Sequence, residues 1–223
     1  MFLEIRSQMK KAFALFELLA KKDILTAHHS LNVACLSKTI AAHYIKTELD
    51  KDKVFIAGLL HDIGKIKLPD FVFSNHVIVK PEEKAIIEMH PIYSKEILEC
   101  AGFDTDIINA VFQHHERFNG SGYPSGLKGY DITPAARLLS IVDSFSAILE
   151  DRPYRKGANV NQAVDIILHD KNLFDVDMLT VFFKNINRIM SLSGIEFERY
   201  NNNFYLSKKG LYKTQKYSIG GIR

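Results

Sequence analysis

The sequence predicts an all-α protein with one hydrophobic core. Apolar residues recur at steps of three and four in successive segments, which is the period of one helix face. Proline followed by acids, as in Pro81-Glu82-Glu83, is typical of the first turn of a helix. The 223 residues are 47% hydrophobic, without a shift in composition that demands two domains, so we expect one sizeable core.

The composition argues against several classes of protein. No run of about 18 apolar residues is present, so we expect no membrane span. Residues 1–22 mix charged with apolar residues, which predicts an amphipathic helix instead of a signal peptide and favours a cytoplasmic protein. Cys35 and Cys100 have apolar neighbours at helical spacing, so we expect reduced, buried thiols. A net charge of +3 is too small to indicate a nucleic-acid partner.

A second helix is predicted from a cap at Asp23 or Thr26 to about Tyr44. A lone histidine on an apolar helix face is usually a core residue with satisfied nitrogens. His29 therefore counts as a metal ligand only if other ligands converge on it. The inward stripe of this helix is His29, Val33, Leu36 and Ile40.

His61 and Asp62 directly follow an apolar run, residues 53–60, that predicts a buried helix ending near Gly64. A buried carboxylate without a partner costs on the order of several kcal/mol. Asp62 therefore needs a cation, which is either Lys65 or a metal ion shared with His61. A polar cap at the end of a helix is the alternative interpretation of this stretch.

The next histidine, His90, is predicted to lie between two helices. Residues 66–80 lack a sustained period and are expected to form a loop. The helix that starts at Pro81 reaches His90, and Pro91 disfavours helical geometry in the residue before it. The resulting junction would fix the direction of the His90 side chain.

Residues 106–116 predict a helix in which His114 and His115 each continue an apolar stripe. Two adjacent buried imidazoles are most easily kept neutral, with their nitrogens satisfied, around a metal ion. A surface histidine pair at a frayed helix end is the alternative.

In the glycine-rich loop that follows, residues 119–129, a ligand can approach closely, and Tyr123 can stack on a base or bind a phosphate.

Thr133 and Pro134 predict the start of a helix on which Asp143 lies within the inward apolar stripe. No lysine or arginine lies one turn away on that helix, so a metal ion is the better partner for Asp143. Residues 151–156 carry three cations around a proline, which indicates either an anion clamp or an ordinary basic helix end.

Two further helices, residues 160–169 and 176–190, are expected to close the core. From Gly194 onward the pattern weakens, and we expect an irregular or hairpin-like tail. Its basic residues more often belong to a solvated segment than to a nucleic-acid site. The predicted organisation is an N-terminal helix at 1–22, a main domain at 23–191 and an extension at 192–223.

The order of the motifs is more specific than any one of them. They are His61-Asp62-Ile63-Gly64-Lys65, His90-Pro91, His114-His115-Glu116-Arg117, Gly120-Ser121-Gly122-Tyr123-Pro124, Asp143 and Asp151-Arg152-Pro153-Tyr154-Arg155. In this order, over roughly residues 29–183, the chain resembles the HD-GYP subgroup of the HD phosphohydrolase superfamily. Members of that subgroup are all-helical phosphodiesterases that bind two or three metal ions, usually iron or manganese, and hydrolyse cyclic di-GMP.

The resemblance implies an HD-domain helical bundle around a metal site, with residues 23–191 as the catalytic domain. It implies that Asp62 bridges two metal ions and that a hydroxide between them attacks the phosphodiester. One ion would be held by His29, His61, Asp62 and Asp143. The other would be held by His90, His114, His115 and the same Asp62.

The resemblance also implies roles around the metal ions. Asp62 and Lys65 would be catalytic, with Lys65 contacting the scissile phosphate or steadying the nucleophile. We further expect Glu116 to orient His114 or His115 from behind. The substrate-binding residues would be Lys65, Gly122, Tyr123, Arg152 and Arg155.

The chain departs from the subgroup at three places. Members with three ions carry a glutamate one helical turn before the first ligand histidine, where this chain has Leu25, so we predict two ions. Asn75-His76-Val77 replaces the usual Lys-Pro-Gly element, and Asn119 stands where an aspartate is usual. These changes are expected to affect substrate affinity without removing the metal site.

The favoured function is hydrolysis of cyclic di-GMP to pGpG, GMP or both, because every expected ligand position from His29 to Asp143 is filled. One alternative is a catalytically silent module that senses cyclic di-GMP or docks a protein through the Gly-Tyr-Pro loop. Another is a phosphohydrolase that acts on a different nucleotide. A homodimer through the N-terminal helix is a further expectation.

Overall fold

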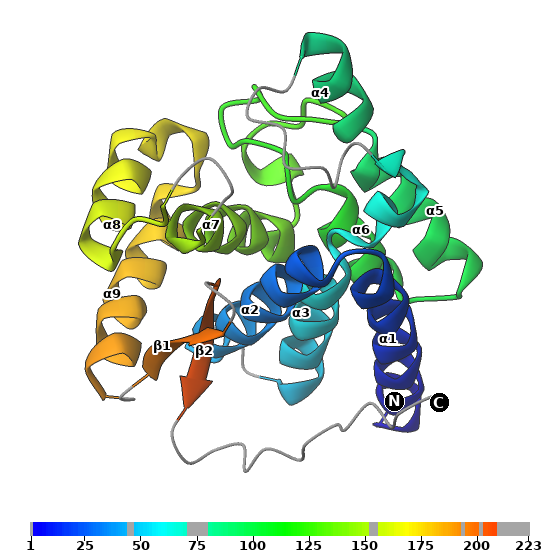
Figure 1. Cartoon of the computed structure of the whole chain (residues 1–223), viewed down its shortest axis with the longest axis horizontal. Helices are drawn as coiled ribbons and strands as arrows, with labels where there is room; N and C mark the ends of the chain where they lie inside the picture. Colours follow the sequence, from blue (N-terminus) through cyan, green and yellow to red (C-terminus); the bar gives the residue numbers. More distant parts are fainter. Residues whose placement is uncertain are drawn as a thin grey trace.

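A computed structural model describes residues 2–43, 47–70, 80–151, 156–192, 195–200 and 203–208. It confirms the all-α domain that the sequence predicts (Figure 1). The α-helices are α1 (Phe2–Lys22), α2 (Ile24–Ala41), α3 (Glu48–Leu60), α4 (Pro81–Ile87), α5 (His90–Cys100), α6 (Thr105–Phe112), α7 (Pro134–Leu149), α8 (Val160–His169) and α9 (Val176–Leu192). Short 3-10 helices are η1 (Ile63–Lys67), η3 (Gly129–Asp131) and η4 (Lys171–Leu173).

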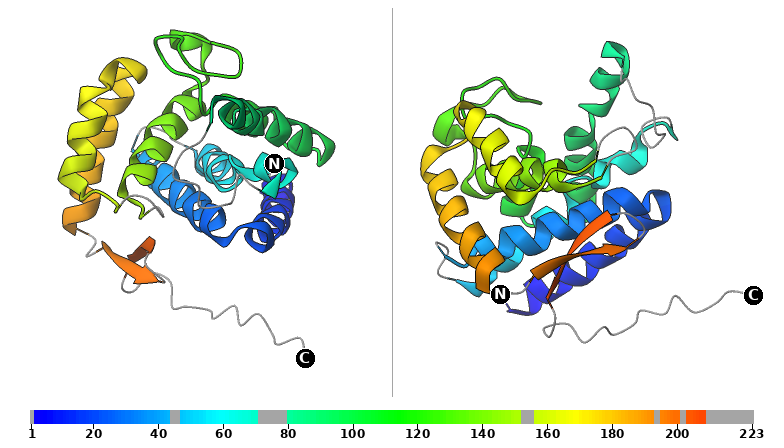
Figure 2. Two further views of the ribbon diagram at one scale, coloured as in Figure 1. Left: turned by 45° about the horizontal axis from the view of Figure 1, so that its top comes forward. Right: turned by 60° about the vertical axis from the view of Figure 1, so that its left-hand side comes forward.

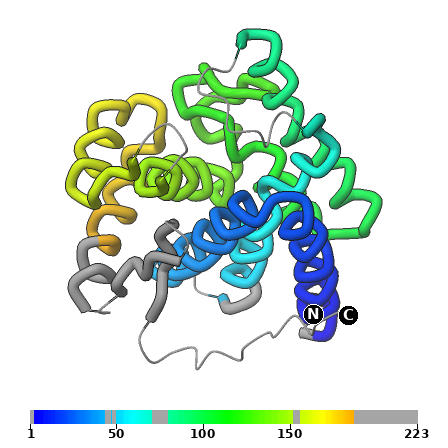
Figure 3. The backbone as a smooth tube through the Cα atoms, in the orientation of Figure 1, coloured from blue at the N-terminus to red at the C-terminus, as the bar shows by residue number. Residues whose placement is uncertain are grey.

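The central helix of the bundle is α2, which packs against α1, α3 and α7 (Figure 1 and Figure 3). On the far side of α7, the pair α8 and α9 completes the bundle (Figure 2). The core is filled by aliphatic and aromatic side chains, which drives the association of these helices. Ile40, Leu59, Leu60, Phe145 and Phe182 are fully buried in it.

Several helix starts follow the capping signals in the sequence, although the Thr133 side chain at the start of α7 makes no capping hydrogen bond. Asp23 accepts a hydrogen bond from the backbone N–H of Thr26 at 2.9 Å and begins α2, as one of the two predicted caps. Pro134 lies in the first turn of α7, where its missing N–H leaves no hydrogen bond unmade. Asn159 and Gln162 form a reciprocal capping box at the start of α8.

Several boundaries differ from the prediction. α2 ends at Ala41, before Tyr44. α6 ends at Phe112, so His114 and His115 lie in the turn after the helix and not on it. α3 ends at Leu60, and Gly64 lies inside η1, so this glycine does not terminate the helix.

The two cysteines are free, as expected, but only one of them is partly shielded. Cys35 is half-buried and Cys100 is exposed, so the expectation that both thiols are buried was wrong. The reason is position: Cys100 is the last residue of α5 and lies beyond the buried face of that helix.

At the end of the described chain, β1 (Ile195–Tyr200) and β2 (Asn203–Lys208) form an antiparallel hairpin in which Tyr200 pairs with Asn203. This agrees with the hairpin-like tail that the sequence predicts. At the other end, α1 contributes Ile5, Ala12 and Leu19 to the same core as the other helices. The division of the chain at residues 22 and 191 stays a prediction.

In the parts of the chain that are described, every helix is too short or too polar to cross a membrane.

Candidate metal centre

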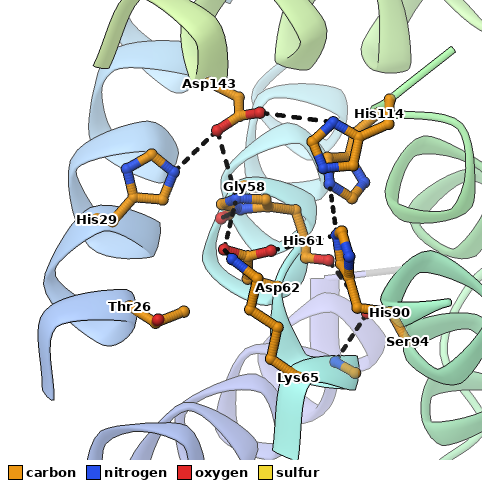
Figure 4. A network of polar contacts seen from close by, with 12 residues as sticks. Thr26, His29, Gly58, His61, Asp62, Lys65, His90, Ser94, His114 and Asp143 are labelled. Atoms are coloured by element: carbon orange, nitrogen blue, oxygen red, sulfur yellow. Dashed lines mark hydrogen bonds and ion pairs between the residues drawn. The ribbon is translucent and has the colours of Figure 1, made fainter. Parts of the chain in front are cut away.

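Seven histidine and aspartate side chains converge in the interior of the bundle (Figure 4). They come from the middle of α2, the end of α3, the start of α5, the turn after α6 and the inner face of α7. Six of them are at most 9% exposed as residues, and the His115 side chain is 18% exposed. They are His29, His61, Asp62, His90, His114, His115 and Asp143, which are the residues that the sequence singled out.

Three of the histidines have the same local geometry. The Nδ1 atoms of His61, His90 and His114 lie 2.8, 2.7 and 2.5 Å from the carbonyl oxygens of Gly58, Ile87 and Val111, three residues earlier in each case. These carbonyls belong to the last turns of α3, α4 and α6, where helix geometry leaves carbonyls without a partner. A carbonyl only accepts, so each Nδ1 carries the proton and each Nε2 presents a lone pair.

These lone pairs fit a bound cation. His61 Nε2 is buried and has no hydrogen-bond partner among the described residues. The Nε2 atoms of His90 and His114 lie 3.3 Å apart, although neither carries a proton in this tautomer. Imidazole and carboxylate donors suit zinc, iron and manganese. The donor set and its unsatisfied nitrogens therefore meet the requirements of a divalent metal site.

The donor atoms divide into two clusters joined by a third. His29, His61 and Asp143 form the first cluster, and His90, His114 and His115 form the second. A group of His61, Asp62 and His114 lies between them. In each group the ligand atoms lie within 4.8 Å of one another.

Asp62 lies between the two clusters and faces both. Its Oδ1 is 3.3 Å from His90 Nε2, and its Oδ2 is 3.5 Å from His61 Nε2. Asp143 makes a second connection, because its Oδ1 is 2.8 Å from His29 Nε2 and its Oδ2 is 3.9 Å from His115 Nδ1. Asp62 and Asp143 thus connect the donor atoms of the two clusters.

The two cations proposed as partners of Asp62 are both compatible with the structure. Lys65 Nζ lies 2.6 Å from Asp62 Oδ2, and Lys65 follows Asp62 by one turn of η1. Burial opposes ionisation of Asp62, but Lys65 and the neighbouring imidazoles hold its pKa well below the usual value. The carboxylate is therefore ionised and available to a metal ion.

Burial and mutual repulsion keep most of the imidazoles neutral. Desolvation, with repulsion from nearby cationic groups, lowers the pKa values of His114 and His115 well below the usual range and that of His90 to about 4. His29 behaves differently. Burial alone would lower its pKa, but Glu150 and Asp143 raise it to about 10.

Gly64 allows the loop after α3 to contact the start of α5. A Cβ at this position would lie 2.1 Å from the carbonyl oxygen of His90. The Gly64 N–H donates to Ser94 Oγ at 2.8 Å, and the same hydroxyl donates to the His61 carbonyl at 3.1 Å. Ser94 thus ties the His61 segment to the helix that carries His90. No local sequence pattern predicts this role for Ser94.

Glu116 supports the glycine-rich loop. Sequence reasoning expected it to orient His114 or His115, but its carboxylate oxygens accept hydrogen bonds from the N–H groups of Ser125 and Leu127 at 2.7 and 2.9 Å. It is 1% exposed, so these bonds are made in the interior. The backbone of the loop, and not a histidine ring, satisfies this carboxylate.

The glycine-rich loop closes over one side of the centre. The Tyr123 ring lies 4.8 Å from the His115 ring, centroid to centroid, and burial raises the pKa of its hydroxyl. A Cβ on Gly122 would lie 2.3 Å from the backbone nitrogen of Arg117, so only glycine fits there. At Asn119, the side-chain oxygen accepts from the N–H of Ser121 at 3.0 Å and shapes the turn.

The remaining residues that the sequence analysis named either offer no donor atom or lie outside the described residues. Leu25 is 46% exposed on α2 and offers no donor atom. Arg152, Arg155 and the Asn75-His76-Val77 segment lie outside the described residues.

Sequence reasoning also missed Glu150, which contacts His29. Its position seven residues after Asp143 on a helical pattern was an available signal, since such residues share a face.

The sequence matches one family model and several named phosphodiesterases. The family model described as "HD domain" matches residues 14–178. The chain is 31% identical over 169 residues to the cyclic di-GMP phosphodiesterase PA4108 of Pseudomonas aeruginosa, covering 75% of this chain and 41% of that protein. It is 29% identical over 194 residues to the 3'3'-cGAMP-specific phosphodiesterase 1 of Vibrio cholerae, covering 86% and 45%. The chain thus spans less than half the length of these relatives.

Solved structures share the fold. The HD domain of the Listeria monocytogenes phosphodiesterase PgpH, in complex with cyclic-di-AMP, matches with a TM-score of 0.62 and 20% identity, over 82% of this chain and 97% of that one. The HDG"Y"P protein Bd1817 from Bdellovibrio bacteriovorus matches with a TM-score of 0.58 and 24% identity, over 82% and 60%. At these identities the likeness is one of fold alone.

Proposed function

Because this chain belongs to the HD-domain family, we propose that it is a metal-dependent phosphodiesterase that hydrolyses cyclic dinucleotides, with cyclic di-GMP as the first candidate substrate. The observation that carries the proposal is the position of Asp62, whose two oxygens face His61 and His90 in separate donor clusters. A bridged pair of divalent ions, when bound, activates water and neutralises charge that develops on a phosphodiester.

The residues of the chain prepare the site for this chemistry. The Nδ1–H groups of His61, His90 and His114 are held by backbone carbonyls, so their Nε2 atoms would accept bound ions without reorganisation of the rings. Asp62 and Asp143 balance part of the positive charge. Lys65, whose side chain is 23% exposed, presents its ammonium beside Asp62 where a phosphate oxygen can reach it.

The proposal assigns two ions, iron or manganese, to the two clusters. Ligation by imidazole and carboxylate without thiolate supports these metals and leaves zinc compatible. The exposed Leu25 offers no donor for a third ion. His29, His61, Asp62 and Asp143 would hold one ion, and Asp62, His90, His114 and His115 the other.

The substrate side of the proposal is supported by the relatives and the loop. The matched relatives are named for cyclic di-GMP and for 3'3'-cGAMP, so the class of substrate is better supported than the base. Tyr123 and Gly122 would line the groove, with Arg152 and Arg155 as the clamp for the dinucleotide. A cytoplasmic location and a homodimer through α1 are also part of this proposal.

Anaerobic turnover tests the function. Protein loaded with manganese or iron is incubated with cyclic di-GMP, with 3'3'-cGAMP and cyclic di-AMP as competitors, and metal content is determined on the same sample. We expect pGpG or GMP with about two ions per chain, and no product from a His61→Ala, Asp62→Ala variant. Metal without product would favour a silent sensor or docking module, and hydrolysis of only another cyclic dinucleotide would correct the substrate.

A further inference from the structure

His29 is held between two carboxylates. Glu150 follows the last residue of α7, and both of its carboxylate oxygens lie 3.0 Å from His29 Nδ1. The other ring nitrogen, Nε2, lies 2.8 Å from Asp143 Oδ1. The side chains of His29 and Glu150 are only 10% and 17% exposed, so this contact is largely shielded from solvent.

His29 needs an acceptor that its own helix does not supply. The rings of His61, His90 and His114 donate to carbonyls in the last turn of a helix, which have no helical partner. His29 lies inside α2, where each carbonyl is occupied by the N–H four residues later. The sequence of α2 also contains no acidic residue, so the acceptor for Nδ1–H has to come from another element.

The two carboxylates around His29 face different surroundings. Asp143 Oδ1 also lies 3.8 Å from His61 Nε2, and Asp143 belongs to the first donor cluster. Glu150 belongs to none of the clusters found among the described residues. Asp143 therefore faces the metal position, and Glu150 lies behind the ring.

We propose that Glu150 is a positioning residue for the first metal position: by accepting the Nδ1–H of His29 it directs Nε2, which becomes the ligand atom once its proton is displaced, toward Asp143 and His61. The inference rests on the proposed metal-dependent function. A carboxylate behind a ligating imidazole fixes the tautomer and raises the basicity of the ligand. Loss of such a partner typically costs roughly 10–100-fold in metal affinity.

Metal titration of the 223-residue chain tests this role without relying on turnover. Manganese binding is measured for the wild type, Glu150→Ala and Glu150→Gln, and the His29 tautomer is read by nitrogen NMR on the zinc-loaded proteins. Glu96→Ala is the matched control, because it removes a half-exposed carboxylate that pairs with Lys67 elsewhere. We expect Glu150→Ala to weaken one of two binding steps by roughly 10–100-fold and to lose the single Nδ1–H tautomer.

The Glu150→Gln variant and the melting temperature distinguish a positioning role of Glu150 from a general effect on stability. Glu150→Gln keeps an acceptor oxygen, so it should retain the tautomer and lose less affinity than Glu150→Ala. Equal affinities and an unchanged tautomer in Glu150→Ala would overturn the inference, as would equal weakening of both steps together with a lower melting temperature of the metal-free protein. A wild type that binds metal but does not hydrolyse cyclic dinucleotides would contradict the proposed substrate and leave this inference standing.

Discussion

The Nε2 atoms of His90 and His114 face each other across 3.3 Å. Both rings donate their Nδ1 protons to backbone carbonyls, so two lone pairs meet in the interior. This arrangement is unfavourable unless a cation lies beside both nitrogens. The backbone that ends α4 and α6 therefore fixes the tautomers of both rings.

Replacing Asp62 by asparagine should disrupt both metal positions, because this carboxylate faces His61 and His90 at once. The amide keeps the shape but loses the charge. We expect the metal content to fall by at least one ion. We also expect kcat/KM to fall by more than about 100-fold, because about 100-fold is the upper end of the effect of losing a residue that only supports a metal ligand.

Elemental analysis and turnover on the same sample measure both effects. Asp52→Asn serves as the control, since Asp52 pairs with Lys38 in a partly exposed ion pair. Full metal content in Asp62→Asn would show that Asp62 is not a bridging ligand.

Metal binding should release a proton from His29. Glu150 and Asp143 overcome the effect of burial and raise the pKa of His29 to about 10, so the metal-free protein holds this proton at pH 7.5. The pKa of His90 is about 4, so His90 has none to release. A metal ion on His29 Nε2 displaces the proton there, so affinity should rise about tenfold per pH unit from pH 7 to 9 and level off above pH 10.

Calorimetric titration in buffers of different ionisation enthalpy counts this proton. Release of about one proton at pH 7.5 is the expected result. An observed enthalpy that does not depend on the buffer would mean that His29 binds the metal without losing a proton.

Gly64→Ala should destabilise the fold and damage the centre. Its Cβ would meet the His90 carbonyl oxygen at 2.1 Å, and backbone cannot easily move away. Overpacking of this kind costs about 1–3 kcal/mol, which lowers the melting temperature by roughly 2–4 °C per kcal/mol in a domain of this size.

Gly102→Ala is the contrasting variant. Gly102 has a φ of 67° but no neighbour closer than 3.7 Å to an added Cβ, so only backbone strain of about 1–2 kcal/mol is expected. It should retain its metal, whereas Gly64→Ala should lose affinity. Equal metal affinity in the two variants would show that the close approach of Gly64 to His90 does not matter for the centre.

Glu116→Gln should affect substrate more than metal. The carboxylate accepts from Ser125 and Leu127, and hydrogen bonds to a charged group are worth about 1.5–3 kcal/mol. Loss of part of this energy loosens the loop that carries Tyr123, so we expect KM to rise about tenfold with unchanged metal content.

Steady-state kinetics and metal analysis separate this outcome from the earlier expectation. If Glu116 oriented His114 or His115, the variant would lose metal affinity with a smaller change in KM. Glu96→Gln, at an exposed position, should change neither quantity.

The residues of the two donor clusters were predictable because each belongs to a local sequence pattern. His29 follows the apolar stripe of its helix, His90 precedes a proline, and Asp143 interrupts an inward face without a cation nearby. These signals depend only on residues within a few turns, so the sequence contains them. The motif order then supplied the grouping into two clusters.

The supporting contacts were not predictable in the same way. Glu150 meets His29 across 121 positions, and Ser94 meets the His61 carbonyl across 33. Such pairs depend on the angle at which helices pack, which local periodicity does not encode. For Glu116, the sequence indicated a polar role, but two backbone N–H groups of the following loop became its partners.

The most direct test of the bridged centre is the anomalous difference density of a crystal of the manganese-loaded protein. We expect two peaks about 3.5–4 Å apart, one on each side of Asp62, with the first beside His29, His61 and Asp143 and the second beside His90, His114 and His115. A single peak, or two peaks that do not share Asp62, would contradict the bridged centre on which the proposed phosphodiesterase depends.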